Sequence, residues 1–516
     1  MKLKKTYKSV LKNHTTCQLI IVFASIISLY GCKPDAIFFE ERQELLKGFY
    51  FESFIIEAKN NPGLEQDIVF DTSNRTNIFA VLDSEIDLSR AVVTYKVHDG
   101  RVKVGDTEQI SGKTVVNLNN PIKYSIYYDK YSEIIVNAYV VPYSGLPIVM
   151  INVMDQKNIE DTETWLPSVM RIYGVNQYED FDDTIQIKGR GNSSWRDFPK
   201  KGYNIKLSQR HKVLDMDKHK RWCLIANWRD RTRLRNEVTY KLGRWSEGME
   251  WNPHERFVEL YLNGKHVGMY NLCETIRVDK NRVDIDELTT NDSTIETISG
   301  GYLLEVDDYK QQDNYFSTPL RKWPFGVAYP EEEDITIPQL KYIKSFIINL
   351  EQKLTERDFE YIRENVDYPS FVDYYLIQTF SGNQDFKTPR SLYFYKKRNG
   401  KLYAGPLWDF DYKTYIDSEK EFFQPVMYKY LFDDPEFIKV MKERWHTMSD
   451  SLVKRTQDYI DRRALYIKRS EIINGAMWPG VKDNGDELLD FDTAIMKMKD
   501  YVKARAEFMN GIIEGF

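Results

Sequence analysis

Apolar and polar residues alternate in short runs through the first part of the chain. Phe51–Ile56, Ala91–Tyr95 and Ile134–Tyr139 are rich in β-branched and aromatic residues, a composition that predicts strands. Turn sequences such as Asp99-Gly100 separate them. Short strands at this spacing predict that residues 47–141 form a small all-β sandwich.

The pattern changes after residues 142–147, a Pro-Tyr-Ser-Gly-Leu-Pro segment that predicts a domain boundary. Strand-like runs continue to about Glu305, and apolar residues then recur at helical spacing. Helices are predicted at Gln339–Leu354, at Pro369–Phe380 and from Pro435 to the C-terminus. Strands followed by helices indicate an α+β fold for residues 148–516, in the order that kinase-like folds use.

The first thirty residues have the pattern of a targeting segment. Five lysines lie within the first twelve residues, and Leu19–Tyr30 is an apolar run too short for a confident membrane span. Leu29-Tyr30-Gly31-Cys32 resembles a bacterial lipobox, although Tyr30 stands where a small residue is usual. We therefore expect a lipoprotein signal peptide over residues 1–32, lipidation of Cys32 and a tether over residues 33–46.

An ordinary cleaved signal peptide and an uncleaved anchor are the alternatives, and all three send the chain across the inner membrane. Lipidation predicts an exported protein, anchored by lipid in the periplasm or at the cell surface. The β-sandwich segment resembles the immunoglobulin-like modules that follow the lipobox in Bacteroidetes surface proteins, which implies a role in spacing or docking.

Composition narrows the class of partner. The 516 residues carry a formal net charge of −6, so no overall positive field favours nucleic acid. Cys17 and Cys32 belong to the leader, and Cys223 and Cys273 lie in apolar, strand-like runs. We expect two small buried side chains there, with a single disulfide as the open alternative, and no structural zinc site.

The first candidate for chemistry is the basic, glycine-rich stretch Gly189–Trp195. Strand-like runs, Thr184–Lys188 and Tyr203–Leu207, flank it on either side. A glycine-rich loop between two strands brings backbone N–H groups and cations together. This arrangement suits a polyphosphate ligand.

The second candidate is a set of three aspartates around a predicted hairpin. Asp385 precedes the hairpin Leu392–Tyr403, and Asp409 and Asp411 follow it. Because a hairpin folds back on itself, we expect its two ends, and these carboxylates, to lie close together. Two carboxylates can hold Mg²⁺ or Mn²⁺ while a third accepts a proton, although a single loop aspartate is more often a turn residue or a helix cap.

Several motifs, in their order along the chain, resemble those of a known family. They are Arg190–Trp195 with Pro199-Lys200-Lys201, Leu224–Asp230 with Arg235-Asn236, Val258–Gly264, Gly268-Met269-Tyr270 with Glu274, Gly300–Glu305, Asn383-Gln384-Asp385 and Trp408–Asp411. In these motifs the chain resembles the CotH kinases, which are related to secreted, atypical protein kinases. The resemblance runs from Val149 to Met509 and implies a two-lobed, atypical kinase-like domain.

The resemblance also implies roles for individual residues. Asp385 resembles the catalytic base, and Asp409, with Asp411 as a further ligand, resembles the metal-binding aspartate of an Asp-Phe-Gly site. Ser391 stands near the position where family members often carry a metal-binding Asn. The residues expected to contact ATP are Lys206 first, then Arg190 and Lys201, with Glu274 as a possible ion-pair partner of the lysine.

The sequence leaves three candidate functions open. The first is an exported phosphotransferase that uses ATP and Mg²⁺ or Mn²⁺ on Ser or Thr of a protein. The second is a surface lipoprotein that keeps the kinase fold for binding and has lost catalysis, which Ser391 would favour. The third, an enzyme acting on glycans, is opposed by the Gly-Arg-Gly loop and by the order of the motifs.

Overall fold

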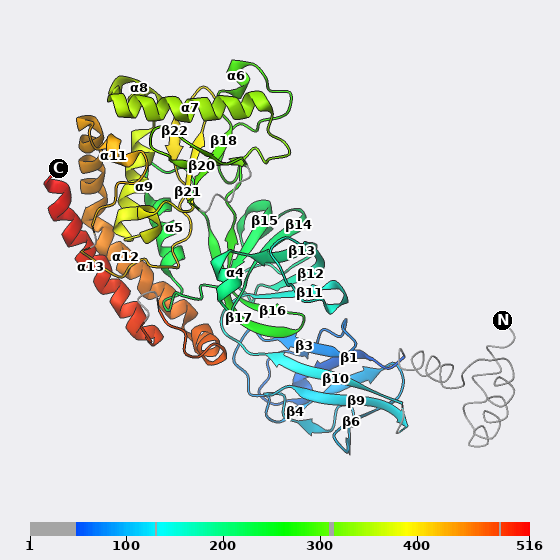
Figure 1. The fold of residues 1–516 in the computed structure, drawn as a ribbon. Helices are drawn as coiled ribbons and strands as arrows, with labels where there is room; N and C mark the ends of the chain where they lie inside the picture. The colour runs from blue at the N-terminus through cyan, green and yellow to red at the C-terminus, as the bar shows by residue number, and fades with distance from the viewer. Residues whose placement is uncertain (1–47, 130–131, 309–313, 420, 484–486) are drawn as a thin grey trace. The chain divides into compact units, whose positions relative to one another are not determined.

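The computed structural model describes residues 48–129, 132–308, 314–419, 421–483 and 487–516. The chain divides into two compact units, Met1–Tyr143 and Ser144–Phe516 (Figure 1). The predicted leader, Cys32 and the tether lie outside the described residues. None of the helices in the described ranges has both the length and the apolar character that crossing a bilayer requires.

The described part of the first unit consists of β-strands and one short 3-10 helix, η2. Its elements are β1 Phe51–Ile56, η2 Ala58–Asn60, β2 Ile68–Val69, β3 Asn77–Val81, β4 Ala91–Val92, β5 Thr94–Val97, β6 Arg101–Val104, β7 Thr107–Glu108, β8 Val115–Val116, β9 Ile122–Asp129 and β10 Ser132–Val141. They form sheets ordered β2-β1-β5, β3-β10-β9-β6-β7 and β4-β8. Buried side chains from all three sheets, among them Phe54, Ala91 and Ile126, form one hydrophobic core.

Two of the predicted strands in this unit are confirmed, and the third is split. Ala91–Tyr95 was expected as one strand, but it divides between β4 and β5. The Val93 carbonyl accepts a hydrogen bond from Gly112, and the Tyr95 N–H donates to the Ser111 hydroxyl. The backbone therefore leaves one ladder before it joins the next.

The second unit begins with a closed barrel ordered β11-β12-β13-β14-β15-β17-β16. The strands are β11 Ile148–Val153, β12 Leu166–Tyr173, β13 Phe181–Arg190, β14 Gly202–Val213, β15 Met216–Ile225, β16 Glu255–Leu262 and β17 Lys265–Glu274. Ile187 and Ile205 are buried in the barrel core, so their neighbours Lys188 and Lys206 point to the outer face. Asn263 and Gly264 form the tight turn between β16 and β17, with φ values of 50° and 73°.

Helical segments interrupt the barrel region: η3 Met154–Gln156, a 3-10 turn, α4 Ser193–Asp197 and α5 Arg235–Trp245. The expectation of strands and loops as far as Glu305 overlooked α5. Its buried positions include Asn236, Glu237 and Thr239, and these polar residues obscure the apolar stripe by which a helix is recognised. Buried hydrogen bonds therefore hold this helix in place together with its apolar contacts, which Val238 and Leu242 make in the core.

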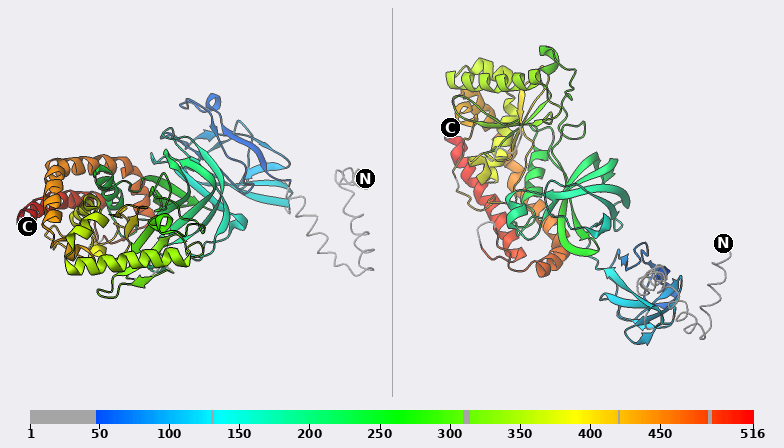
Figure 2. Two further views of the ribbon diagram at one scale, coloured as in Figure 1. Left: turned by 90° about the horizontal axis from the view of Figure 1, so that it is seen from above. Right: turned by 45° about the vertical axis from the view of Figure 1, so that its right-hand side comes forward.

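A second sheet, ordered β19-β20-β18-β21-β22, and a group of helices complete the unit. The strands are β18 Tyr302–Val306, β19 Phe316–Ser317, β20 Pro324–Tyr329, β21 Leu392–Lys396 and β22 Leu402–Ala404. The helices are α6 Ile295–Ile298, α7 Ile337–Glu356, α8 Phe359–Asn365, α9 Tyr368–Phe380, α10 Gln384–Lys387, α11 Tyr428–Leu431, α12 Pro435–Met477 and α13 Phe491–Glu514. The predicted helices are confirmed, and the C-terminal one is a pair, α12 and α13, whose members lie side by side (Figure 2). The mixed α+β class is likewise confirmed.

Candidate active site

Asp385 lies in α10, a single helical turn that directly follows α9. The Asn383 side chain caps this turn by accepting a hydrogen bond from the Asp385 N–H at 3.0 Å. Asn383 is itself held by Gln378, to which its amide donates at 2.9 Å. The Asp385 side chain is 20% exposed, and its carboxylate lies 3.5 Å from the Arg390 guanidinium. The site therefore presents this carboxylate from a rigid turn.

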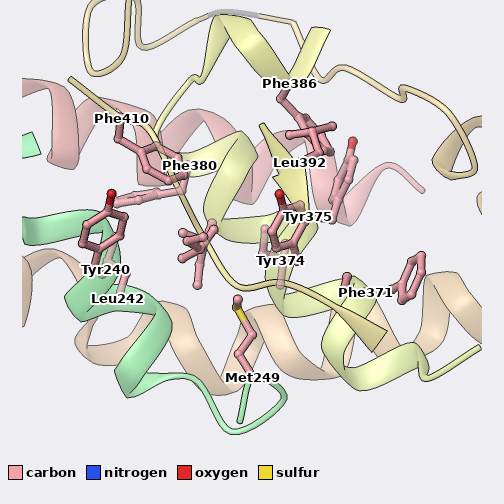
Figure 3. Packing of buried hydrophobic residues seen from close by; sticks show 14 of the residues in the cluster. Tyr240, Leu242, Met249, Phe371, Tyr374, Tyr375, Phe380, Phe386, Leu392 and Phe410 are labelled. Atoms are coloured by element: carbon pink, nitrogen blue, oxygen red, sulfur yellow. The ribbon is translucent and has the colours of Figure 1, made fainter. Parts of the chain in front are cut away.

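Asp409 lies in the loop that follows β22, with a left-handed backbone φ of 66°. Its N–H donates to the Tyr240 hydroxyl at 3.4 Å, and the next N–H, of Phe410, donates to the Asn236 side chain at 2.7 Å. Phe410 is fully buried and packs edge-on against Tyr240 (Figure 3). Two residues of α5 thus fix the turn that exposes the Asp409 carboxylate.

The pKa shifts of Asp385 and Asp411 indicate that the carboxylates of the three predicted aspartates lie close together. Burial, with the neighbouring Asp409 charge as the next cause, raises the pKa of Asp385 to about 6. Burial also raises the pKa of Asp411 well above its ordinary value, again helped by Asp409, to which it is hydrogen-bonded. Carboxylates that raise one another's pKa in this way favour a shared proton or a bound cation.

Arg190, at the end of β13, is a cation within electrostatic range of this acidic group. Its guanidinium lies over the Trp408 ring, 5.2 Å from the centroid. Burial opposes its charge, but the nearby Cys223 and Asp409 are among the groups that raise its pKa overall. The glycine-rich loop therefore begins beside the carboxylates, as a phosphate-binding loop would require.

A cavity of about 800 Å³ lies between the barrel and the second sheet, and neither the three aspartates nor Arg190 is among its lining residues. Lys188 and Arg221 line it from the outer face of the barrel, and Leu303, Val327 and Tyr393 line it from the second sheet. Tyr393 also connects the cavity to the acidic group, because Arg190 and Asp307 both influence its pKa. Glu331, Glu332 and Glu333 line the cavity as well, so charges of both signs surround it.

Metal binding by this site can be judged from the donor set. Within the described ranges no three His, Cys, Asp or Glu side chains are grouped closely enough to hold a metal. The hydrogen-bonded pair Asp409 and Asp411 does fit Mg²⁺, which is commonly held by one or two carboxylates while water and substrate phosphates complete the shell. These two residues are therefore the candidate metal ligands.

The remaining predicted residues lie elsewhere. Lys206 points to the outer face of the barrel beside Arg221 but is not among the residues that line the cavity. Lys201 lies over the Trp195 ring and donates to the Trp195 carbonyl. It therefore anchors the glycine-rich loop, whereas it was expected to contact phosphate. No hydrogen bond between described residues joins Ser391 to Asp409 or Asp411.

The predicted pairing of Glu274 with Lys206 is not found. Glu274 accepts hydrogen bonds from the His254 N–H and ring, at 2.9 and 3.0 Å, and lies 3.4 Å from Arg282. The reason is strand alternation: Glu274 is opposite Trp222, whereas Lys206 is opposite Arg221. The two side chains therefore point to opposite faces of the barrel wall.

The comparison with protein families decides the identity of this unit. Residues 185–509 match the family described as CotH kinase protein. The chain belongs to this family. No curated protein matches the chain. Membership indicates an atypical kinase with ATP as phosphate donor, and the matched range contains Arg190, Asp385, Asp409 and Asp411.

The CotH kinase unit also has site residues that the sequence analysis missed. Lys188 and Arg221 are the cations of the cavity wall, and Asn236 holds the Asp409 turn. Lys188 could have been found from the sequence, because it lies two residues before Arg190 on the same strand and therefore shares its face. Asp307, which helps to raise the pKa of Asp385, directly follows β18 and carried no sequence signal of its own.

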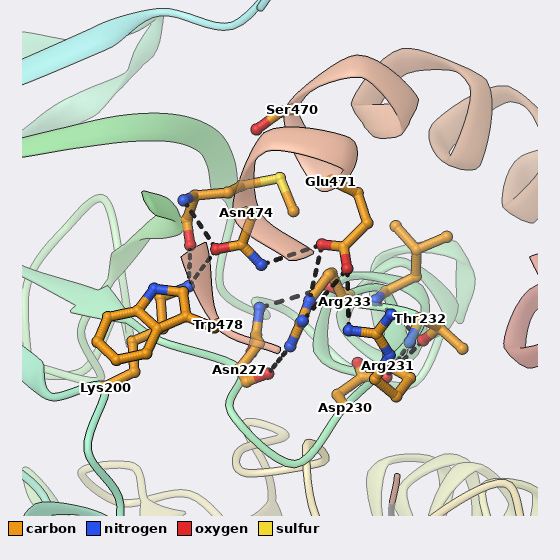
Figure 4. Close-up of polar contacts among 12 residues, drawn as sticks. Lys200, Asn227, Asp230, Arg231, Thr232, Arg233, Ser470, Glu471, Asn474 and Trp478 are labelled. Atoms are coloured by element: carbon orange, nitrogen blue, oxygen red, sulfur yellow. Dashed lines mark hydrogen bonds and ion pairs between the residues drawn. The ribbon is translucent and has the colours of Figure 1, made fainter. Parts of the chain in front are cut away.

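The glycine-rich loop of this CotH kinase ends in a buried anchor at Lys200. Its ammonium donates to the Met269 carbonyl at 2.5 Å and to the Asn474 side chain at 3.0 Å. Asn474 belongs to α12 and donates in turn to Glu471, the ion-pair partner of Arg233 (Figure 4). One face of α12 thus fixes both the loop and the segment before α5.

Proposed function

We propose that this chain transfers the terminal phosphate of ATP to a hydroxyl group of Ser or Thr in a protein acceptor. The observation that carries the proposal is the grouping of Asp385, Asp409 and Asp411 with Arg190 at the start of the glycine-rich loop, where the Asp409 charge shifts the pKa values of the other three side chains. The barrel with its glycine-rich loop and the second sheet with its helices would then be the two lobes of a kinase-like domain.

Each side chain has a distinct task in this reaction. Asp385 is the base that accepts the proton of the attacking hydroxyl, since a pKa of about 6 leaves it ionised at neutral pH yet more basic than an ordinary aspartate. Arg190, beside Asp409, is placed to pair with phosphate oxygens. Asp409 and Asp411 would hold Mg²⁺ or Mn²⁺, which when bound neutralises charge on the phosphates.

The proposal is tested by comparing ATP binding with phosphate transfer. With ATP and Mn²⁺, we expect wild-type protein to melt at a higher temperature and to transfer labelled phosphate to itself or to an added protein. Asp385→Asn should keep the melting shift and lose transfer by about 10²–10⁴-fold. Asp409→Asn should lose both.

Asp182→Asn serves as the matched control, because Asp182 is 64% exposed and pairs only at the surface with Arg171. It should behave as wild type. If millimolar ATP with Mn²⁺ gives no melting shift, the binding-protein alternative replaces the kinase proposal. A shift without transfer in the wild type would support a nucleotide-binding scaffold.

Export and anchoring form a second part of the proposal, supported by the leader sequence alone. Lipidation at Cys32 would hold the chain to a membrane in the periplasm or at the cell surface, with the β-rich first unit as an immunoglobulin-like spacer or docking module. Fatty-acid labelling that is lost in Cys32→Ala would support this part. Cleavage elsewhere in the leader, without lipid, would leave an ordinary signal peptide.

A further inference from the structure

Cys223 on β15 and Cys273 on β17 lie directly opposite each other on neighbouring antiparallel strands. Both side chains are fully buried, and the Cys223 sulfur lies 3.7 Å from the Cys273 carbonyl oxygen. Opposite residues of such strands have Cβ atoms about 4.5–5.5 Å apart, close to the roughly 3.5–4.5 Å of a disulfide. A small movement of the two strands would therefore bring the sulfurs to bonding distance.

In the closed barrel the two thiols differ in pKa. A hydrogen bond with Cys273 lowers the pKa of Cys223, burial opposes this, and the nearby Arg190 and Arg282 charges add to the lowering. Burial instead raises the pKa of Cys273 well above its ordinary value. These shifts belong to the closed barrel, in which neither sulfur is accessible, so they do not set the order in which the two cysteines react.

We propose that Cys223 and Cys273 are a redox pair that closes into a cross-strand disulfide within the barrel. The oxidant is a protein or small-molecule disulfide. The thiolate of one cysteine attacks a sulfur of the oxidant and releases one thiol, and the thiolate of the other cysteine then attacks the first cysteine's sulfur and releases the second thiol. Two electrons pass to the oxidant, and the two cysteine protons leave with the released thiols.

The bond would act on the elements that build the active site. It would close the segment between the two cysteines, which contains α5 and therefore Asn236 and Tyr240, the residues that hold the Asp409 turn. A cross-link of this kind stabilises the folded state by restricting the unfolded chain. Since both sulfurs are inaccessible in the folded barrel, exchange must take place before β15 and β17 pair, or when they open.

The experiment is refolding of the denatured full chain in a mixture of oxidised and reduced glutathione, followed by alkylation and non-reducing peptide mapping. Trypsin places Cys223 in peptide 222–229 and Cys273 in peptide 266–277, each with a single cysteine. We expect these two peptides to be joined and lighter by two hydrogen atoms than their sum. The joined form should disappear on reduction.

Thermal melting supplies the second measurement. The refolded wild type should melt at a higher temperature before reduction than after, whereas Cys223→Ala/Cys273→Ala should melt at one temperature in both conditions. Alkylated, unlinked peptides 222–229 and 266–277 in the natively refolded protein would overturn the proposal, as would linkage of either cysteine to Cys17, Cys32 or glutathione. The peptide map of the wild type decides the matter even if the double variant fails to fold. Neither measurement depends on phosphate transfer.

Discussion

At the scale of single residues, burial makes the Asp385 carboxylate more basic and also lowers the stability of the folded state at neutral pH. The folded state raises its pKa to about 6 from an ordinary value of 3.8, so folding favours the protonated carboxyl. The associated stability is fully present below about pH 4 and is lost as the pH rises through 6. At neutral pH the ionised carboxylate therefore destabilises the fold that holds it.

Asp385→Asn should consequently stabilise the protein while it removes activity. In metal-free buffer at pH 8 we expect the free energy of unfolding to rise by about 1–3 kcal/mol, with the gain shrinking toward zero at pH 4. Denaturant unfolding at both pH values measures this difference. The exposed-site variant Asp182→Asn should show no such gain, and an Asp385→Asn variant less stable than wild type at pH 8 would contradict the argument.

At the scale of elements, α5 acts on the site through the buried side chains of Asn236 and Tyr240. Asn236 accepts the hydrogen bond of the Phe410 N–H at 2.7 Å and donates to Asn227 at 3.2 Å. Asn227 donates in turn to Asn271 on β17 at 2.8 Å. The carboxylate turn is therefore tied through α5 to the barrel by a chain of amides.

Removing this link should weaken ATP binding, although Asn236 itself contacts no ligand. Asn236→Ala leaves a buried N–H unpaired, which costs about 1–3 kcal/mol, and frees the turn to move. We expect a lower melting temperature and at least a tenfold weaker Mn²⁺-dependent ATP affinity by calorimetry. Asn137→Ala, in the first unit, is the control. An unchanged ATP affinity in Asn236→Ala would show that the turn holds its shape without α5.

The buried anchor of the glycine-rich loop gives a second prediction at this scale. Lys200→Met keeps an apolar side chain but removes the ammonium, which lies over the Tyr270 ring and donates to Met269 and Asn474. We expect a loss of about 1–3 kcal/mol in unfolding free energy and faster proteolysis within residues 191–201. Lys212→Met, at an exposed position on β14, should change neither property. Equal proteolysis of both variants would mean that α4 alone orders the loop.

At the scale of the whole molecule, the chain consists of two units with separate cores. Such units commonly unfold independently. Calorimetry of the full chain should show two transitions, and a chain that begins at Ser144 should retain the one that ATP and Mn²⁺ shift. A single transition, or loss of the ATP response on truncation, would show that the β-rich unit is part of the catalytic fold.

Local pattern was sufficient to predict several of the strands, the long helices and the approach of the three aspartates. Alternation and helical spacing are properties of neighbouring residues, and a hairpin brings its own ends together whatever surrounds it. The Asp385, Asp409 and Asp411 group follows from that short segment. The α5 helix was not predicted, because polar residues occupy many of its buried positions.

Tertiary structure decided which cations face the ligand and which cysteines face each other. Strand alternation showed that Lys188 and Arg190 share one face, but only the closed barrel and the second sheet showed that this face borders the cavity. The partners of Glu274 and the pairing of Cys223 with Cys273 depend on register between strands far apart in sequence. Register is set by packing of the whole barrel, because a shift of one residue would turn every side chain to the other face.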